Sequence, residues 1–138
     1  MGMSEIAASE QLADLVFLAL DHGIESVSEG GPLIPFSVTE TSTGERTVTR
    51  FAAETLEDGY SAAREHLAKS GAERAVVARD GYLTVEGART DAVIVEGQER
   101  DGASVSVVFA QRYRPGGRLR KFQTIGNAAF VGDGDSLF

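Results

Sequence analysis

The chain has 138 residues, of which 42% are hydrophobic and 25% charged, which is ordinary for one packed globular domain and excludes disorder of the whole chain. It contains no cysteine, so disulfides, thiolate metal ligands and a cysteine nucleophile are excluded. The formal net charge of −8 disfavours nucleic acid and anionic membranes as partners.

The N-terminal residues 1–5 show neither the basic stretch nor the apolar run of a secretory signal. The longest apolar run, residues 15–20, is too short to cross a bilayer. We therefore expect a soluble, cytoplasmic protein that does not bind membranes.

Residues 9–21 predict the first helix, with Ser9 as the N-cap and His22-Gly23 as the stop signal. Its apolar residues recur at helical spacing: Leu12, Leu15, Val16 and Ala19. Residues 24–31 are polar and glycine-bearing, so no regular element is expected there.

A β-hairpin is predicted next, because residues 33–39 and 47–51 are rich in β-branched and aromatic side chains. The second helix follows from Thr55, a capping-box start, to Ser70-Gly71. Gly59 is a local weakness within this helix, worth up to about 1 kcal/mol relative to alanine.

The rest of the chain predicts a four-stranded meander, whose strands span 75–86, 92–98, 103–114 and 118–126. Asp101-Gly102 is the strongest two-residue turn signal. Asp80-Gly81 is either a further turn or a bulge in one long strand, and the bulge is favoured. The acidic, glycine-rich residues at about 128–138 predict a loosely held tail.

Together these elements predict a single α+β domain over residues 1–138, with two helices packed on a curved, mostly antiparallel sheet of about six strands in the order α-β-β-α-β-β-β-β. We expect both helices on one face of the sheet. Residues 92–95 are apolar without alternation, as in a strand covered on both sides. Val108 and Ala110 also point away from the main core face. The second face then either curls around a pocket or packs on another copy of the chain.

This order of elements resembles that of cone-shaped α+β folds of the nuclear transport factor 2 type. In that family helices close a curved sheet around a pocket. The resemblance implies a site for a small molecule, and it adds no cofactor or catalytic residue.

Basic residues gather near the end of the otherwise acidic chain. Residues 1–104 carry 8 basic and 19 acidic side chains, whereas residues 105–138 carry 5 and 2. The predicted anion-binding residues are Arg112, Arg114, Arg118 and Arg120, whose guanidinium groups suit a small anionic ligand.

Two registers are possible for this hairpin. A three-residue turn at 115–117 places Arg114 opposite Arg118 and Arg112 opposite Arg120, whereas a two-residue Gly-Gly turn places Arg112 opposite Lys121. The ordinary alternative to an anion site is that the arginines pair with the chain's own acids, such as Glu86 and Asp91.

The two histidines do not form a metal or catalytic signature. His22 is expected at a helix end, and His66 lies on the second helix near Tyr60, so these two residues, Tyr60 and His66, mark a possible pocket. Asp133-Gly134-Asp135 lacks the further ligands of a calcium loop. No metal and no cofactor is predicted.

Three functional hypotheses remain open, and catalysis is undecided among them. The first is a non-catalytic binding or assembly domain that self-associates through its sheet, with a homodimer favoured. The second is a small-molecule pocket protein or enzyme of the cone-shaped type. The third is an acidic inhibitor of a basic protein partner.

Overall fold

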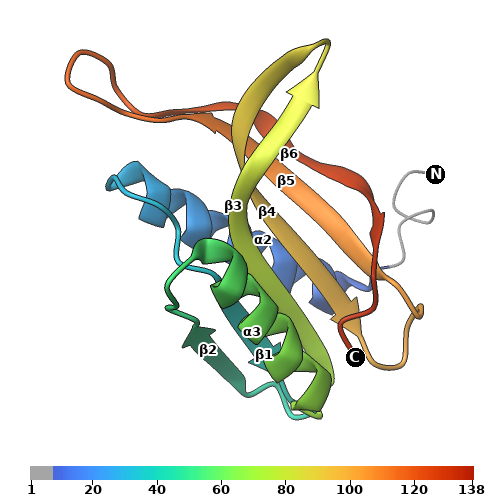
Figure 1. Cartoon of the computed structure of the whole chain (residues 1–138). Helices are drawn as coiled ribbons and strands as arrows, with labels where there is room; N and C mark the ends of the chain where they lie inside the picture. The colour runs from blue at the N-terminus through green and yellow to red at the C-terminus, as the bar shows by residue number, and fades with distance from the viewer. Residues whose placement is uncertain (1–7) are drawn as a thin grey trace.

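The computed structural model describes residues 8–138 and has the predicted α+β order, with two helices and a six-stranded antiparallel sheet (Figure 1). The helices are α2 (Glu10–Ser28) and α3 (Leu56–Lys69). The strands are β1 (Phe36–Glu40), β2 (Arg46–Arg50), β3 (Arg74–Val85), β4 (Ala88–Glu99), β5 (Ser106–Arg114) and β6 (Gln123–Gly134). The absence of a targeting signal was inferred from residues 1–5, which lie outside the described residues.

The sheet is open, with the strand order β2-β1-β3-β4-β5-β6, so that β2 and β6 form its edges. β3 and β4 pair without interruption from Arg74↔Glu99 to Val85↔Ala88. The predicted single long strand across Asp80-Gly81 is therefore confirmed, whereas the bulge favoured there and the alternative turn are both wrong. The sharp turn is instead Glu86-Gly87, where both residues have positive φ angles of 52° and 81°, as in a type I′ hairpin.

Helix α2 starts where the sequence predicts, because the Ser9 hydroxyl accepts a hydrogen bond from the Leu12 N–H at 3.1 Å. The same hydroxyl donates to Glu99 at 2.8 Å, which ties the start of α2 to the end of β4. The predicted stop at Gly23 is wrong. A Cβ at Gly23 would lie 2.7 Å from Val93, so this glycine lets the helix approach the sheet, and α2 ends only before the left-handed Gly30.

Helix α3 also begins at its predicted cap, since the Thr55 hydroxyl accepts from the Asp58 N–H at 3.0 Å. Gly59, which weakens the isolated helix, has a packing role in the folded chain. A Cβ there would collide with the backbone oxygen of Phe51 and crowd Pro35. The glycine thus allows α3 to lie close to the segment that leads into it.

The two helices cover opposite faces of the sheet, which corrects the prediction that both lie on one face (Figure 1). Helix α2 packs on β3, β4 and β5, and α3 packs on β1 and β3. In β3, Val76 and Ala78 belong to the core under α2, whereas Ala75 and Val77 belong to the core under α3. The sheet stays open with a helix on each face, so the cone-shaped arrangement implied by the resemblance is not present.

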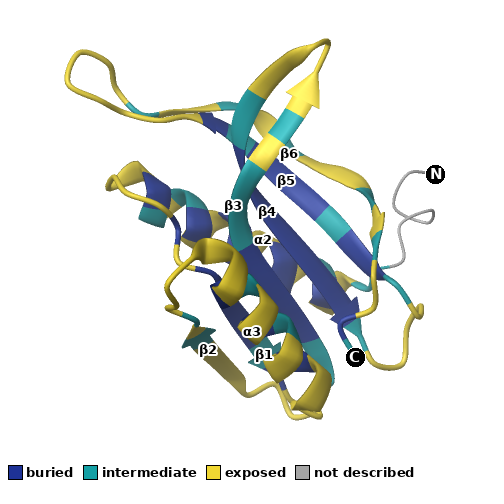
Figure 2. Cartoon of the chain, viewed as in Figure 1, coloured by how far each residue is buried: buried dark blue, intermediate teal, exposed yellow. Residues whose placement is uncertain are grey.

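The central strands are buried on both faces (Figure 2). The prediction of two-sided burial is confirmed for residues 92–95, each of which is at most 7% exposed. Residues 75–78 show the same pattern, each at 0%. On the face of α3, beyond the reach of that helix, Ala92, Ile94 and Ala110 form a small third cluster, against which Val108 packs partly buried.

Both later connections of the meander are longer than predicted. The Asp101-Gly102 pair does not form a two-residue turn, because Gly97 pairs with Val107 and residues 100–105 connect β4 to β5. Residues 115–122 form the longer projecting connection between β5 and β6 (Figure 1).

The end of the chain is part of the fold. Residues 128–134, expected in the loose tail, form the second half of β6. Leu137 is 2% exposed in the core under α3, and its N–H donates to Gln98 Oε1 at 2.6 Å. Among the described residues, neither helix is apolar enough over a sufficient length to cross a membrane.

The close approach of α2 to β4 gives a prediction for stability. A Cβ at Gly97 would lie 2.9 Å from Val16 and 3.1 Å from Val76, whereas one at Gly117 would meet nothing within 4 Å. We expect Gly97→Ala to lower the free energy of unfolding by about 1–3 kcal/mol, because the core must be overpacked. Urea denaturation checks this, and Gly117→Ala is the matched control. Equal midpoints for the two variants would contradict the packing.

Candidate functional site

The four arginines of the predicted anion site lie on two different parts of the chain, the strand β5 and the connection that follows it. Arg112 and Arg114 lie on β5, where they pair with Ile125 and Gln123 of β6. Because side chains alternate along a strand, Arg112 points to the face opposite its neighbour Tyr113, which belongs to the core under α2. Arg112 therefore lies on the face of α3.

The other two cations lie outside the β5–β6 ladder. Arg118 and Arg120 are exposed residues of the 115–122 connection, as is Lys121. Neither predicted register is present, since Arg112 is opposite neither Arg120 nor Lys121. Neither register forms because the chain reverses direction over all of residues 115–122 and not only at its two glycines.

Pairing of these arginines with nearby acids is not found either. Within residues 8–138, no ion pair joins Glu86 or Asp91 to the arginines of β5 or of the connection. This end of the molecule thus carries a basic, projecting loop, with Leu119 at 98% exposure among its cations. Anion binding there stays a prediction.

A buried polar cluster lies between α3 and β4. The Tyr60 hydroxyl donates to Glu96, whose side chain is only 8% exposed. Arg64 Nη1 lies 3.0 Å from the Tyr60 oxygen and 3.1 Å from Glu96 Oε2, and its Nη2 donates to the Ser136 carbonyl at 2.9 Å. The Arg79 guanidinium lies 5.0 Å from the centre of the Tyr60 ring.

The hydrogen bonds of this cluster stabilise the packing of α3. Burial, together with the hydrogen bond to Glu96, raises the pKa of Tyr60, so the phenol stays protonated and serves as a donor. Glu96 has a hydroxyl and a guanidinium as partners, which offsets the cost of its burial. Through these bonds α3, β4 and the end of the chain are held together.

The structure does not bring Tyr60 and His66 into one pocket. They are six positions apart on α3, and at 3.6 residues per turn their side chains leave the helix in different directions. The His66 ring packs 5.3 Å from the Phe51 ring. His22, expected at a helix end, lies inside α2, where its ring meets Phe36 edge-on at 5.0 Å.

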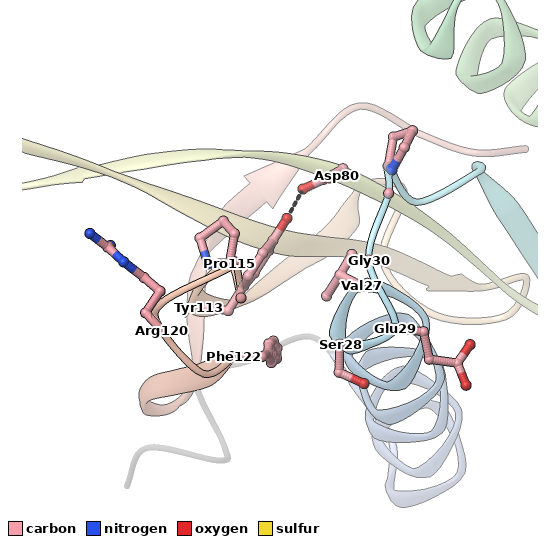
Figure 3. Close-up of a pocket in the computed structure, with 13 residues that line it drawn as sticks. Val27, Ser28, Glu29, Gly30, Asp80, Tyr113, Pro115, Arg120 and Phe122 are labelled. Atoms are coloured by element: carbon pink, nitrogen blue, oxygen red, sulfur yellow. Dashed lines mark hydrogen bonds between the residues drawn. The ribbon is translucent and has the colours of Figure 1, made fainter.

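Sequence reasoning missed a large hollow at the end of α2. A cavity of about 540 Å³ separates the C-terminal end of α2 from the β5–β6 connection (Figure 3). Val27, Gly30 and Pro32 line one side of it, and Tyr113 and Phe122 line the other. The sequence indicates turns at residues 30–32 and 115–117, but no local sequence pattern shows that these two turns lie close together in the fold.

Asp80 and Tyr113 form the polar end of this cavity. The Tyr113 hydroxyl donates to Asp80 Oδ1 at 2.8 Å (Figure 3). Burial raises the pKa of the Asp80 carboxyl, although the bond from Tyr113 and the backbone N–H groups of Leu33 and Gly81 act in the other direction. The nearby Asp91 carboxylate adds to the increase.

An apolar surface patch lies at the other end of β6. Phe17 of α2, at 44% exposure, and Phe130 of β6, at 38%, both pack edge-on against the buried Phe109, at 5.7 and 5.5 Å. Val131 follows at 50% exposure. Phe17, Phe130 and Val131 together are called the β6 patch.

Comparison with known proteins gives no match among family models, curated proteins or solved structures. The architecture alone therefore defines the class: an α+β protein with an open six-stranded antiparallel sheet and one helix on each face. Within residues 8–138, no three histidine, aspartate or glutamate side chains gather to hold a metal ion.

The shifted pKa of Asp80 predicts a pH dependence of stability. An acid whose pKa is higher in the folded state binds its proton more tightly there, so protonation favours folding and the ionised form costs stability at neutral pH. Asp80→Asn removes that cost and keeps an acceptor for Tyr113. We expect the variant to be more stable than the wild type near neutral pH, where the difference between their free energies of unfolding should be largest. This advantage should shrink as the pH falls through the raised pKa toward the usual aspartate value of about 3.9.

Urea denaturation of both proteins at a series of pH values measures this difference. A difference that is the same at every pH would contradict the burial of the Asp80 carboxylate. A difference that grows on acidification would reverse the sign of the shift.

Proposed function

We propose that this chain is a non-catalytic assembly domain that forms a homodimer through the β6 patch. The observation that carries the proposal is that Phe17 and Phe130, each more than a third exposed, pack on one buried ring, that of Phe109, and that the exposed Val131 follows Phe130 on the edge strand. Single exposed apolar residues are normal, but contiguous ones mark contact surfaces. A second copy of the chain offers the same patch, as a two-fold interface requires.

The two edges of the sheet differ in a way that favours β6. The short strand β2 begins and ends with Arg46 and Arg50, and Arg46 is paired with Glu40 at 2.7 Å. Charges at a short edge strand oppose strand pairing. β6 is longer and carries a single charged residue, Asp133. Charged side chains therefore oppose association through β6 less than association through β2.

Side chains supply most of the proposed contact. The register between β5 and β6 shifts between Val108 and Phe109 and again between Ala110 and Arg112. Such irregularities bend an edge strand and shorten the stretch that could add another strand. The patch lies next to one of these shifts, so aromatic packing is the main attraction in this proposal.

The net charge opposes the dimer, so the proposal predicts how the dissociation constant depends on salt. Two copies of a chain with a formal charge of −8 repel each other, whereas contact between apolar side chains does not weaken in salt. Raising the salt from about 0.1 M to about 1 M shortens the Debye length from about 10 Å to about 3 Å. A dimer formed by the β6 patch should therefore tighten with added salt.

We expect Val131→Lys to weaken the dimer at least about tenfold in Kd, because an isologous interface would contain the new charge twice. Val48→Lys is the matched control, since Val48 is 54% exposed on the opposite edge strand β2. Sedimentation equilibrium of the wild type and both variants measures the dissociation constants.

Three outcomes would overturn the proposal. The first is a wild-type protein that stays strictly monomeric at high concentration. The second is an equal effect of the two lysine variants. The third is a dimer that weakens with salt, which would assign association to the basic 115–122 loop of one copy and the acidic surface of another.

A further inference from the structure

The cavity at the end of α2 has the composition of a ligand site. Its two walls come from segments far apart in the sequence, residues 27–32 and residues 113–122, with Asp80 of β3 between them (Figure 3). A volume of about 540 Å³ lies within the range of small-molecule sites, about 300–1,000 Å³. The lining is mixed: Val27, Pro32, Tyr113 and Phe122 supply its apolar and aromatic surface, and Ser28, Glu29, Asp80 and Arg120 supply polar or charged groups.

The apolar part of the site is largely aromatic. The rings of Tyr113 and Phe122 lie 5.5 Å apart with an angle of 41° between their planes, on the side formed by β5 and the connection. Val27 faces them across the gap (Figure 3), and Pro32 also lines the cavity. Paired aromatic rings of this kind attract cations through their negative faces, besides providing apolar area.

The fixed charge of the site is negative. Asp80 bonds the neutral hydroxyl of Tyr113, and within residues 8–138 no cationic side chain forms an ion pair with it. The C-terminal end of α2 lies beside the cavity and has no basic residue in its last turn, so its partial negative charge is uncompensated there.

The one cationic residue of the lining, Arg120, does not reverse this balance. Figure 3 shows its side chain extending away from the gap between Tyr113 and Val27. The carboxylate of Glu29 also points outward. The charged group that remains at the gap itself is Asp80.

We propose that this cavity binds a small organic cation, an ammonium group with an apolar or aromatic body. The ammonium group lies between Asp80 and the rings of Tyr113 and Phe122, and the body lies against Val27 and Pro32. Binding supplies the counter-charge that the partly buried carboxylate lacks, and it does not depend on the proposed dimer. Burial raises the pKa of Asp80 in the free protein, which is the direction expected of a carboxylate without a cationic partner.

Isothermal titration calorimetry with benzyltrimethylammonium chloride tests the proposal. Benzyl alcohol serves as the neutral ligand, and pyrophosphate tests the anion site predicted from the arginines. We expect the ammonium compound to bind the wild type, benzyl alcohol to bind at least about tenfold more weakly, and pyrophosphate not to displace it.

Two variants locate the site. Asp80→Asn keeps the acceptor for Tyr113 and should weaken the cation at least about tenfold. Asp133→Asn changes the net charge equally at an exposed position of β6 and should leave the affinity within about twofold. Phe122→Leu, which keeps an apolar side chain, should weaken the cation more than it weakens benzyl alcohol.

Each alternative outcome has a defined meaning. No heat from the ammonium compound with a folded wild type would overturn the proposal. Equal affinities for the ammonium compound and the alcohol, or equal effects of Asp80→Asn and Asp133→Asn, would show that charge is not recognised in the cavity. Pyrophosphate binding that is lost in Arg120→Ala would assign the site to anions instead. Circular dichroism and urea midpoints of each variant separate loss of binding from loss of folding.

Discussion

The whole architecture depends on covering β3 and β4 on both faces. Residues 75–78 and 92–95 bury every side chain, so neighbouring positions in each strand need cores on opposite sides of the sheet. One helix cannot satisfy both sets. Helix α2 covers the first face at close range because Gly23 and Gly97 leave room for it, and α3 with the end of the chain covers the second face at β3, while Ala92 and Ile94 of β4 pack in the separate third cluster.

The polar cluster under α3 follows from the same constraint. Helix α3 is short and packs mainly on β1 and β3, and it buries few apolar side chains of its own. Its attachment to β4 rests on Tyr60 and Arg64, which share the buried Glu96. A carboxylate in such a place is destabilising unless it is paired, so the cluster makes the position of α3 specific as well as stable.

Local sequence signals predicted the elements well, and long-range packing explains where they failed. Ser9 and Thr55 were identified as caps because capping is a contact within one turn. Gly23 and Gly81 were misread because a glycine that ends a helix or bends a strand looks the same as one that admits a neighbouring side chain. In the structure they admit Val93 and Ile94. The side of the sheet taken by α3 could have been inferred from Ala75–Ala78, which lack alternation just as residues 92–95 do.

The candidate sites show the same division between local and distant information. The basic cluster is visible in the sequence, because its five cations lie within ten residues. The cavity is not, because Asp80 and Tyr113 are 33 positions apart and meet only through the pairing of β3, β4 and β5. The error in the predicted register of the β5–β6 hairpin also changed where the arginines were expected. Once the 115–122 connection is longer than a tight turn, the arginines expected to face one another are spread over a strand and a loop.

The β6 patch and the cavity use different parts of the same helix, because Phe17 lies near the middle of α2 and Val27 lies near its C-terminal end. Val27 at the cavity lies ten residues after Phe17 in the patch, which is about 15 Å along α2 at 1.5 Å per residue. The proposed two-fold contact, centred on Phe17 and Phe130, and the proposed ligand site therefore have different centres. Because α2 is seated on β3, β4 and β5, the proposed dimer contact and the wall of the cavity share one supporting element. The proposed binding and the proposed assembly thus use separate residues of the same helix.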